Sequence, residues 1–278
     1  MSARAGSLRS LYTDPAYYSM LFDGRESDVA FYAHLAARAS SDSIQGLSRP
    51  VSVLEYGVGA GRIGIPLARA GYEVFGVDTS PEMLRALAER ASNESRDVQS
   101  RLAWCEGDAR EVSLGRVFDL VLCPFNGIAH HHGRHELRAF LVRVREHLAP
   151  DGVFAFDVWL PNPTLLSGGS TCSPVFFHPR TNEPVRCTET FEYDPFSQVL
   201  TTRVSIAPAA RAGEPEVLTL RVRQLFPEET MLLLESHGFE VVWRTSRFAP
   251  PLDDSGGGLE TEGEDERGEM IAYVCRLR

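Results

Sequence analysis

Short apolar runs alternate with amphipathic stretches through the middle of the chain, and this pattern predicts strands and helices in turn. The predicted strands are 51–55, 72–78, 102–106, 118–123 and 153–159. Helical periodicity follows the first strand from 62 to 70 and precedes the last one from 135 to 148. Strands that alternate with helices are typical of a mostly parallel sheet with helices packed on it.

The alternation breaks between residues 161 and 223, where short strands are joined by Pro, Asn, Asp and Gly turns. The expected strands are 175–177, 185–193, 199–206 and 217–223. This pattern predicts an inserted antiparallel sheet. Because the segment is rich in Phe and Tyr and lacks clustered basic residues, it suits a lid over a small substrate or a homodimer face.

The chain beyond the insertion returns to the pattern of the core. A helix over 226–237 precedes strands at 239–245 and 269–277, and strands joined without a helix can pair antiparallel. The acidic, Gly-rich stretch from Asp253 to Glu269 is expected to be a mobile surface loop, with a lid as the alternative. We therefore expect four parts. They are an N-terminal cap and linker (1–49), a core (50–160), an inserted antiparallel lid (161–223) and the C-terminal part of the core (224–278).

Three alternating glycines, Gly57, Gly59 and Gly61, follow the first core strand. Glycine lets the backbone adopt positive φ and approach a ligand closely. A dinucleotide-binding turn would place its third glycine at position 62, which is arginine. Glu55, two residues before the first glycine, disfavours a phosphate and suits positive charge. The turn therefore predicts a nucleoside ligand that is cationic and lacks a diphosphate.

Acidic residues also follow the second and third core strands. Asp78 lies about 20 residues beyond the glycine turn, where a carboxylate accepts the hydroxyl groups of a ribose. Asp108 follows the third strand, and there it fits either a ligand contact or ordinary Gly-Asp turn chemistry.

This series of motifs resembles that of the class I S-adenosylmethionine-dependent methyltransferases. The resemblance implies an α/β fold with a Rossmann-like, seven-stranded, mostly parallel sheet and a terminal antiparallel hairpin, here with an N-terminal helical cap and the inserted antiparallel sheet. It implies S-adenosylmethionine as the cofactor. The cofactor-binding candidates of the core are Glu55, Gly57, Gly59, Gly61, Asp78, Thr79, Met83, Asp108, Ala109 and Cys123.

The resemblance also assigns roles to these candidates. Glu55 and the glycines would hold the methionine end and the sulfonium side, and Asp78 the ribose. Thr79 and Met83 would flank the adenine, although a single Met on a helix also fits core packing. Asp108 and Ala109 would bind the edge of the adenine.

The pattern Tyr18-x-x-x-Phe22-x-Gly24-Arg25-x-x-Asp28 is similar to the N-terminal segment of small-molecule N-methyltransferases that act on amino sugars. The resemblance implies that an aromatic side chain of this segment covers the sulfonium, with Phe22 at the matching position and Tyr17 and Tyr18 as further candidates. An aromatic staple on the core is the alternative. An amine acceptor is therefore expected, with a hydroxyl acceptor as the second possibility.

The loop after the fourth core strand, residues 124–132, leaves the sheet beside the glycine turn and is expected to form a wall of the active site. Asn126, His130 and His131 are the catalytic candidates in it. An imidazole with a pKa near the working pH can accept the proton of an amine nucleophile. A surface loop without catalytic function is the alternative, and the histidines lack the partners of a recognised metal-binding spacing.

Composition narrows the function classes. The net charge of −10 disfavours nucleic acid as a partner, and the apolar runs are too short to cross a bilayer. Five cysteines without a Cys-x-x-Cys spacing fit a reducing cytoplasm, and the first ten residues lack the apolar segment of a secretory signal.

Two other function classes remain open at this stage. One is an NAD-dependent oxidoreductase, which the arginine at position 62 disfavours. The other is a non-catalytic cofactor-binding protein that has kept the fold and lost the chemistry.

Overall fold

The structure of the protein is a computed structural model that describes residues 9–42, 50–209, 214–248 and 268–278. The chain forms two compact units, each built from two segments. One unit consists of Met1–Gly24 with Pro161–Gln224, and the other of Arg25–Leu160 with Leu225–Arg278. The segment predicted as a mobile acidic loop lies almost entirely outside the described residues.

The larger unit contains a seven-stranded sheet in the order β12-β13-β6-β5-β2-β3-β4. Its strands are β2 (Ser52–Tyr56), β3 (Glu73–Asp78), β4 (Leu102–Glu106), β5 (Phe118–Cys123), β6 (Leu148–Trp159), β12 (Phe239–Thr245) and β13 (Met270–Leu277). Strands β2 to β6 pair in parallel, whereas β13 pairs antiparallel with both β6 and β12. The predicted fold class, including the antiparallel hairpin at the end of the chain, is confirmed.

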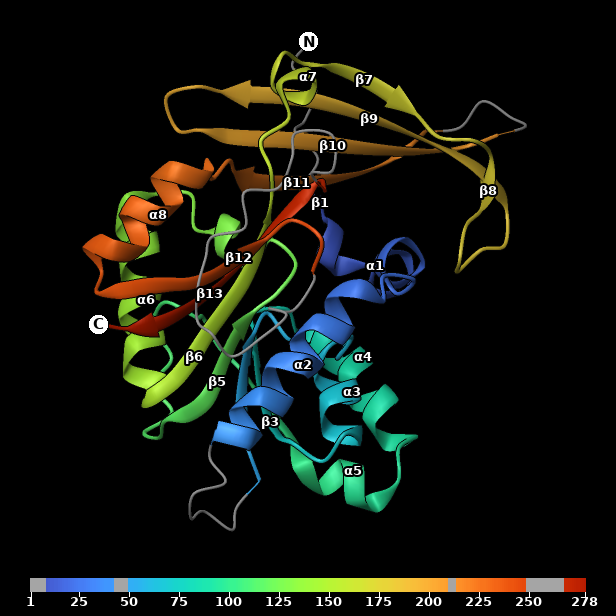
Figure 1. Cartoon of the computed structure of the whole chain (residues 1–278). Helices are drawn as coiled ribbons and strands as arrows, with labels where there is room; N and C mark the ends of the chain where they lie inside the picture. The colour runs from blue at the N-terminus through green and yellow to red at the C-terminus, as the bar shows by residue number, and fades with distance from the viewer. Residues whose placement is uncertain (1–8, 43–49, 210–213, 249–267) are drawn as a thin grey trace. The chain divides into compact units, whose positions relative to one another are not determined.

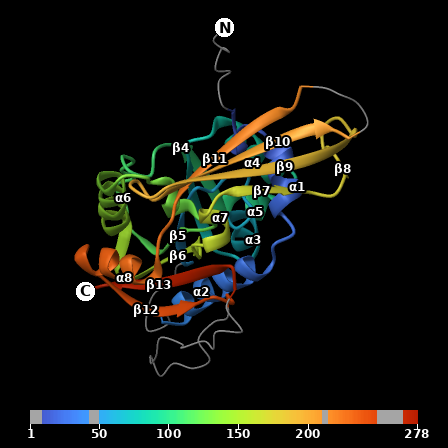
Figure 2. The ribbon, with the colours of Figure 1, turned by 90° about the horizontal axis from the view of Figure 1, so that it is seen from above.

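Helices cover both faces of this sheet (Figures 1 and 2). One face carries α2 (Ser27–Asp42), α3 (Gly64–Arg69), α4 (Pro81–Ser92) and α5 (Arg96–Arg101), and the other carries α6 (Arg134–His147) and α8 (Pro227–Ser236). The buried residues Phe31, Leu67 and Leu87 come from three different helices of the first face. The second face is closed by aromatic contacts, such as Phe140 of α6 against Tyr56 and Phe154. The central parallel strands β2 and β5 therefore lie between two apolar layers, as their continuous apolar runs predict.

The smaller unit is built around a six-stranded sheet. Its strands are β1 (Arg9–Ser10), β7 (Gly169–Cys172), β8 (Phe176–Phe177), β9 (Pro184–Asp194), β10 (Val199–Pro208) and β11 (Glu216–Arg223). Strands β9, β10 and β11 form an antiparallel meander, and β1 adds to β11 in parallel. A separate antiparallel sheet was predicted for this part of the chain and is confirmed, but β1, β7 and the short helix α7 (Pro163–Leu166) were not foreseen.

The N-terminal helix α1 (Pro15–Phe22), which follows a short 3₁₀ turn η1 (Leu11–Thr13), packs on one face of this smaller sheet. Tyr17 is almost completely buried there, beside Val185, Cys187 and Leu218. Asp14 caps the helix by accepting from the Tyr17 backbone and also forms an ion pair of 2.6 Å with Arg180. The aromatic N-terminal segment therefore has its own apolar partner within this unit.

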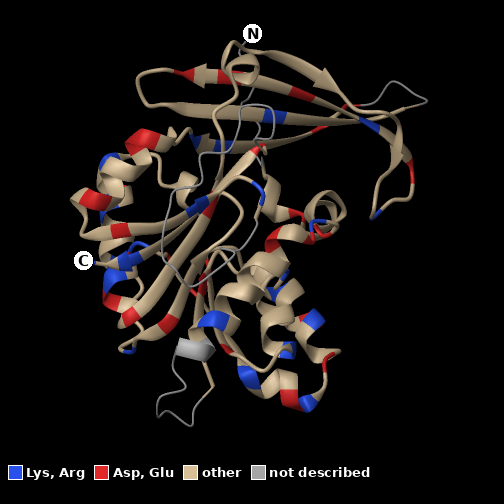
Figure 3. Ribbon diagram, viewed as in Figure 1, with Lys and Arg blue, Asp and Glu red and all other residues tan. Residues whose placement is uncertain are grey.

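Charged residues of both signs are interspersed on the helices (Figure 3). Several form ion pairs within one helix, such as Arg85 with Glu82 and Arg143 with Glu146. Such exposed pairs add little stability each. Over the described ranges, every helix is too short or too polar to cross a bilayer.

Candidate active site

The glycine turn lies between β2 and α3, at the carboxyl ends of the parallel strands. Gly57, Gly59 and Gly61 all have left-handed backbones, with φ of 73°, 54° and 83°. The amide groups of Gly57 and Val58 donate to the Val77 carbonyl, at 2.7 and 3.2 Å, which ties the turn to β3. A Cβ at position 61 would lie 2.5 Å from a methyl carbon of Leu87, which would have to move, and the positive φ also favours glycine there. The turn therefore presents bare main chain at the edge of the sheet where open parallel sheets bind ligands.

Glu55 lies beneath this turn and is 2% exposed. Its Oε2 atom has no hydrogen-bond partner, and burial raises the pKa of its carboxyl group to about 8, although nearby Arg62 opposes the shift. A Cβ on Gly64 would lie 2.9 Å from Oε2, so the glycine at the start of α3 makes room for the acid. A cation bound above this acid would stabilise its charged form, which agrees with the predicted preference for a cationic ligand.

Asp78 ends β3 and meets the glycine turn at Gly59. Its Oδ2 accepts from the Gly59 amide and its Oδ1 from the Ser80 amide, both at 2.8 Å. Thr79 is exposed beside it, and the buried Met83 side chain reaches to within 3.5 Å of where a Cβ on Gly59 would lie. The structure therefore brings together the residues predicted for the ribose and the adenine. Each carboxylate oxygen of Asp78 keeps acceptor capacity for a hydroxyl group.

Asp108 is half-buried just beyond β4, next to Ala109, and its carboxylate is bound by Arg110. The guanidinium of Arg110 donates to both oxygens, at 2.9 Å from Nε to Oδ1 and 2.5 Å from Nη2 to Oδ2. This pairing lowers the pKa of Asp108. Arg110 also binds Glu136 at the start of α6. The sequence analysis did not predict a role for Arg110. The only sign of it in the sequence is its position two residues after Asp108.

The loop after β5 contains the three catalytic candidates, which differ in their surroundings. Asn126 is buried, and its Oδ1 accepts from the Trp159 amide at 3.3 Å. His130 is half-buried at the end of the 3₁₀ turn η3 (Gly127–His130). His131 is buried with its ring 4.6 Å from that of Phe140 between centroids.

Burial next to Arg110 lowers the pKa of His131 to about 4. This imidazole is therefore neutral at physiological pH but a weak base. Cys123 lies buried under the loop, where a Cβ on Gly127 would come within 2.6 Å of its Sγ atom. Burial raises the pKa of the Cys123 thiol, so it remains uncharged. Of the two histidines, His130 is the one with access to solvent.

Tyr18 and Phe22 lie on α1 in the smaller unit, where their rings form an edge-to-face contact with 4.8 Å between centroids. Both are half-buried against the apolar cluster around Leu11 and Tyr17. Packing within their own unit therefore accounts for these contacts. Their role over the sulfonium stays a prediction.

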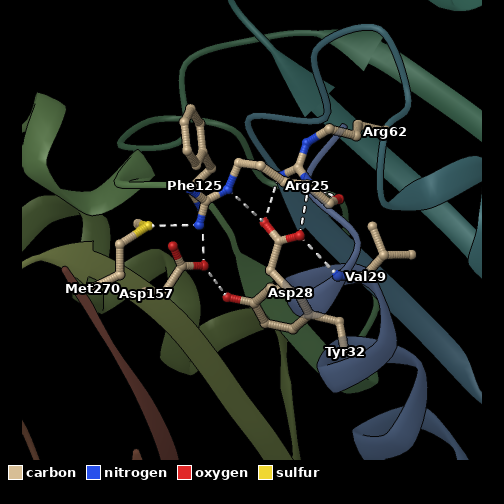
Figure 4. A network of polar contacts seen from close by, with 8 residues as sticks. All are labelled: Arg25, Asp28, Val29, Tyr32, Arg62, Phe125, Asp157 and Met270. Carbon is tan, nitrogen blue, oxygen red and sulfur yellow. Dashed lines mark hydrogen bonds and ion pairs between the residues drawn. The ribbon is translucent and has the colours of Figure 1, made fainter. Parts of the chain in front are cut away.

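A buried polar network beside the glycine turn was not foreseen from the sequence (Figure 4). Asp28 of α2 is completely buried and accepts two hydrogen bonds from Arg62, at 2.8 and 2.7 Å. Asp157 of β6 accepts from the hydroxyl of Tyr32 and, at 2.9 Å, from the amide of Phe125. The only sequence signals were the Arg25-x-x-Asp28 pattern and the arginine in place of a sixth-position glycine.

Comparisons with known proteins find methyltransferases. A model of a methyltransferase domain family matches residues 53–152. An N,N-dimethyltransferase of dTDP-3-amino-3,6-dideoxy-alpha-D-glucopyranose from Streptomyces fradiae is 30% identical over 179 residues, which are 61% of this chain and 66% of that protein. The chain thus aligns with just under two thirds of this relative's length.

Solved structures cover the chain more fully. The CcbJ methyltransferase from Streptomyces caelestis has a TM-score of 0.71 and 25% identity, over 92% of this chain and 97% of the other. CalS10, an amino pentose methyltransferase from Micromonospora echinaspora solved with S-adenosylmethionine bound, has a TM-score of 0.64 and 19% identity over 94% and 96%. With the glycine turn, the acids at the strand ends and the antiparallel hairpin, these matches show a methyltransferase domain over residues 53–152 in a chain with the fold of the class I S-adenosylmethionine-dependent methyltransferases.

Proposed function

We propose that the protein transfers a methyl group from S-adenosylmethionine to an amine nitrogen of a small molecule. The proposal depends on one observation, the hydrogen bond from the Gly59 amide to the Asp78 carboxylate. This bond brings the exposed main chain of the glycine turn next to a carboxylate that can accept ribose hydroxyl groups. The buried Glu55 supports a ligand with positive charge, since that charge would offset the cost of ionising the acid.

The residues present fit the cofactor. Gly57, Gly59 and Gly61 would line the methionine and sulfonium end, Asp78 would accept the ribose hydroxyl groups, and Asp108 with Ala109 would bind the adenine edge. S-adenosylmethionine carries a methyl group already activated on sulfur, so the protein need not provide a covalent nucleophile. The work left to the chain is to hold the acceptor in line with the methyl group, which can contribute up to about 7–11 kcal/mol.

The amine acceptor is supported by the named activity of the Streptomyces fradiae relative, which methylates an amino sugar nucleotide. An amine must lose a proton before or during attack, and the half-buried His130 is the better placed base because the pKa of His131 is lowered to about 4. Asn126 would shape the acceptor wall. A hydroxyl acceptor is the second candidate function, and it would need a stronger base than His131.

Isothermal titration calorimetry tests the cofactor part of the proposal. Purified protein should bind S-adenosylmethionine and not NAD, and Asp78→Ala should weaken the binding at least tenfold through the lost ribose hydrogen bonds. Asp97→Ala, which removes an exposed acid paired with Arg101 in α5, is the control and should leave the affinity unchanged. NAD binding, or equal affinity in Asp78→Ala, would contradict the assignment.

A panel of acceptors tests the reaction. Amino sugar nucleotides, simple amines and matched hydroxyl compounds are incubated with the protein and S-adenosylmethionine, and mass spectrometry detects a gain of one or two methyl groups. We expect methylated amines. Methylated hydroxyl compounds alone would favour the second candidate function, and tight cofactor binding without any product would favour a non-catalytic protein.

A further inference from the structure

The loop after β5 begins with an unfavourable backbone. Phe125 and Asn126, which follow one another, both adopt left-handed conformations, with φ of 49° and 64°. Asparagine tolerates this region, but for a bulky side chain such as Phe it is strained. Such strain persists only where neighbouring structure holds it in place, so the contacts of these two residues identify what holds them.

Asp157 of β6 holds both residues. Its Oδ1 accepts from the Phe125 amide at 2.9 Å, and its main-chain carbonyl accepts from the Asn126 amide at 3.0 Å. The hydroxyl of Tyr32, from α2, donates to the same Oδ1 atom. Two residues further along β6, the amide of Trp159 donates to the Asn126 side chain. The turn is therefore bonded to β6 at three points, and Asp157 makes two of them.

The side chain of Phe125 is held from the other direction. The guanidinium groups of Arg25 and Arg62 lie 5.1 and 5.4 Å from the centre of its ring, within the range of cation–π contacts (Figure 4). Asp28 fixes Arg62 through two hydrogen bonds, and Arg62 directly follows the last glycine of the turn. Phe125 lies in the loop that carries the catalytic candidates, and its ring contacts Arg62, which adjoins the glycine turn. The contact therefore links the loop to the glycine turn.

Asp157 is costly as a purely structural residue. It is completely buried, its Oδ2 atom has no hydrogen-bond partner, and burial raises the pKa of its carboxyl group to about 6 against the opposing effect of Tyr32 and Phe125. Of the charged groups around it, Asp28 raises the pKa further and Arg62 lowers it, and the guanidinium of Arg25 also lies beside the carboxylate (Figure 4). A buried carboxylate and two left-handed residues therefore coincide at one point, and strain of this kind clusters at functional sites.

We propose that Asp157 is a positioning residue for methyl transfer, which sets the acceptor wall by holding Phe125 and Asn126 in their left-handed conformations. This inference rests on the proposed function, since it is that function which places Asn126 and His130 at the acceptor. Asp157 acts through these residues and not on the substrate itself. Its loss should therefore impair use of the acceptor far more than binding of the cofactor.

Three variants separate the contacts. Asp157→Ala removes the acceptor of the Phe125 amide, Asp157→Asn keeps an oxygen at that position, and Tyr32→Phe removes only the hydroxyl donor. Asp119→Ala is the matched control. Asp119 lies near the start of β5, at the other end of that strand from the loop, and its carboxylate accepts from the Ser52 amide at 2.8 Å. Each of the four variants changes the hydrogen bonding between a carboxylate and a neighbouring segment of the larger unit, either at the carboxylate or at its donor.

Two measurements are made on each variant. Hydrogen exchange of the amides from 125 to 131 reports the loop and needs no turnover, while steady-state kinetics with the best amine acceptor give KM and kcat beside the Kd of S-adenosylmethionine. For Asp157→Ala we expect at least tenfold faster exchange in this loop, at least a tenfold lower kcat/KM for the acceptor, and a cofactor Kd within threefold of the parent. Asp157→Asn should recover most of kcat/KM, and Asp119→Ala should change neither loop exchange nor kcat/KM by more than threefold.

The outcomes are distinguishable. Unchanged loop exchange in Asp157→Ala, an equal loss in Asp119→Ala, or a cofactor Kd that weakens as much as kcat/KM falls would each overturn the positioning role. If Asp157→Ala fails to fold, Asp157→Asn and Tyr32→Phe decide by the same criteria, with Tyr32→Phe expected to give an intermediate increase in loop exchange. If the parent protein methylates no amine, the proposed function fails, and the exchange data still show whether Asp157 holds the loop.

Discussion

At the scale of single residues, Glu55 offers a test of how the site recognises charge. S-adenosylmethionine has a positive charge on sulfur that S-adenosylhomocysteine lacks, and a buried carboxylate interacts with charge over several ångströms in a medium of low dielectric constant. Above about pH 8, where the Glu55 carboxyl group is charged, Glu55→Gln removes the negative charge and keeps the shape. We expect about a tenfold loss of affinity for S-adenosylmethionine and less than a threefold loss for S-adenosylhomocysteine.

Calorimetry with both nucleosides at one pH measures this difference. Glu82→Gln on α4, which removes an acid from a surface ion pair with Arg85, serves as the control and should leave both affinities unchanged. An equal loss for the two nucleosides in Glu55→Gln would mean that Glu55 supports the glycine turn without sensing the sulfonium charge.

The residues that could be located from sequence are those that end a strand. Glu55 and Asp78 follow from the period of the apolar runs, because the carboxyl ends of parallel strands lie at one edge of the sheet. The bond between Tyr32 and Asp157 joins residues 125 positions apart, and no local pattern records it. The burial of His131 likewise depends on packing against Phe140, so sequence alone could not rank it against His130.

At the scale of elements, the glycine turn favours glycine for two different reasons, a positive φ angle and a lack of space for a Cβ atom. Gly57 and Gly61 both have positive φ, but a Cβ on Gly57 would meet nothing within 4 Å, whereas one on Gly61 would lie 2.5 Å from Leu87 in α4. Gly57→Ala therefore adds backbone strain alone, about 1 kcal/mol, and Gly61→Ala adds overpacking of about 1–3 kcal/mol to that strain. Urea unfolding of the two variants should rank them in this order, and an equal or larger loss in Gly57→Ala would show that the α4 contact yields freely.

The elements that were missed have local causes. Helix α3 begins at Gly64 and not at residue 62, because residues 61–63 still belong to the turn that follows β2. The short strands β1 and β7 are recognisable only through their partners β11 and β9, since two to four residues carry no period. The long core strands and helices were predictable because each shows its own apolar period over a full segment.

At the scale of the whole molecule, buried ionisable groups of two kinds determine how stability depends on pH. Burial raises the pKa of Glu55 to about 8 and of Asp157 to about 6, so the folded chain binds these protons more tightly than the unfolded chain. Their stabilisation is complete below their unfolded pKa values and is lost as pH rises through the folded values. Burial lowers the pKa of His131 to about 4 and also lowers that of His147, so their stabilisation is present above about pH 6.5 and is lost as pH falls.

The stabilisation from the acids falls with rising pH and that from the histidines falls with decreasing pH, which makes the two sets separable by mutation. From about pH 6.5 to 9 the stability lost through Glu55 is not offset by a gain from either histidine, so the melting temperature of the parent should fall over this range. Near pH 5–6 the stability lost through the acids as pH rises is offset by the stability gained through the histidines. The advantage of Glu55→Gln over the parent should therefore grow with rising pH. His131→Phe, whose ring can stack on Phe140, should gain on the parent as pH falls from about 7 to 5. Thermal unfolding of the three proteins from pH 5 to 9 measures both trends, and differences that stay constant across the range would show that these two groups do not titrate with folding.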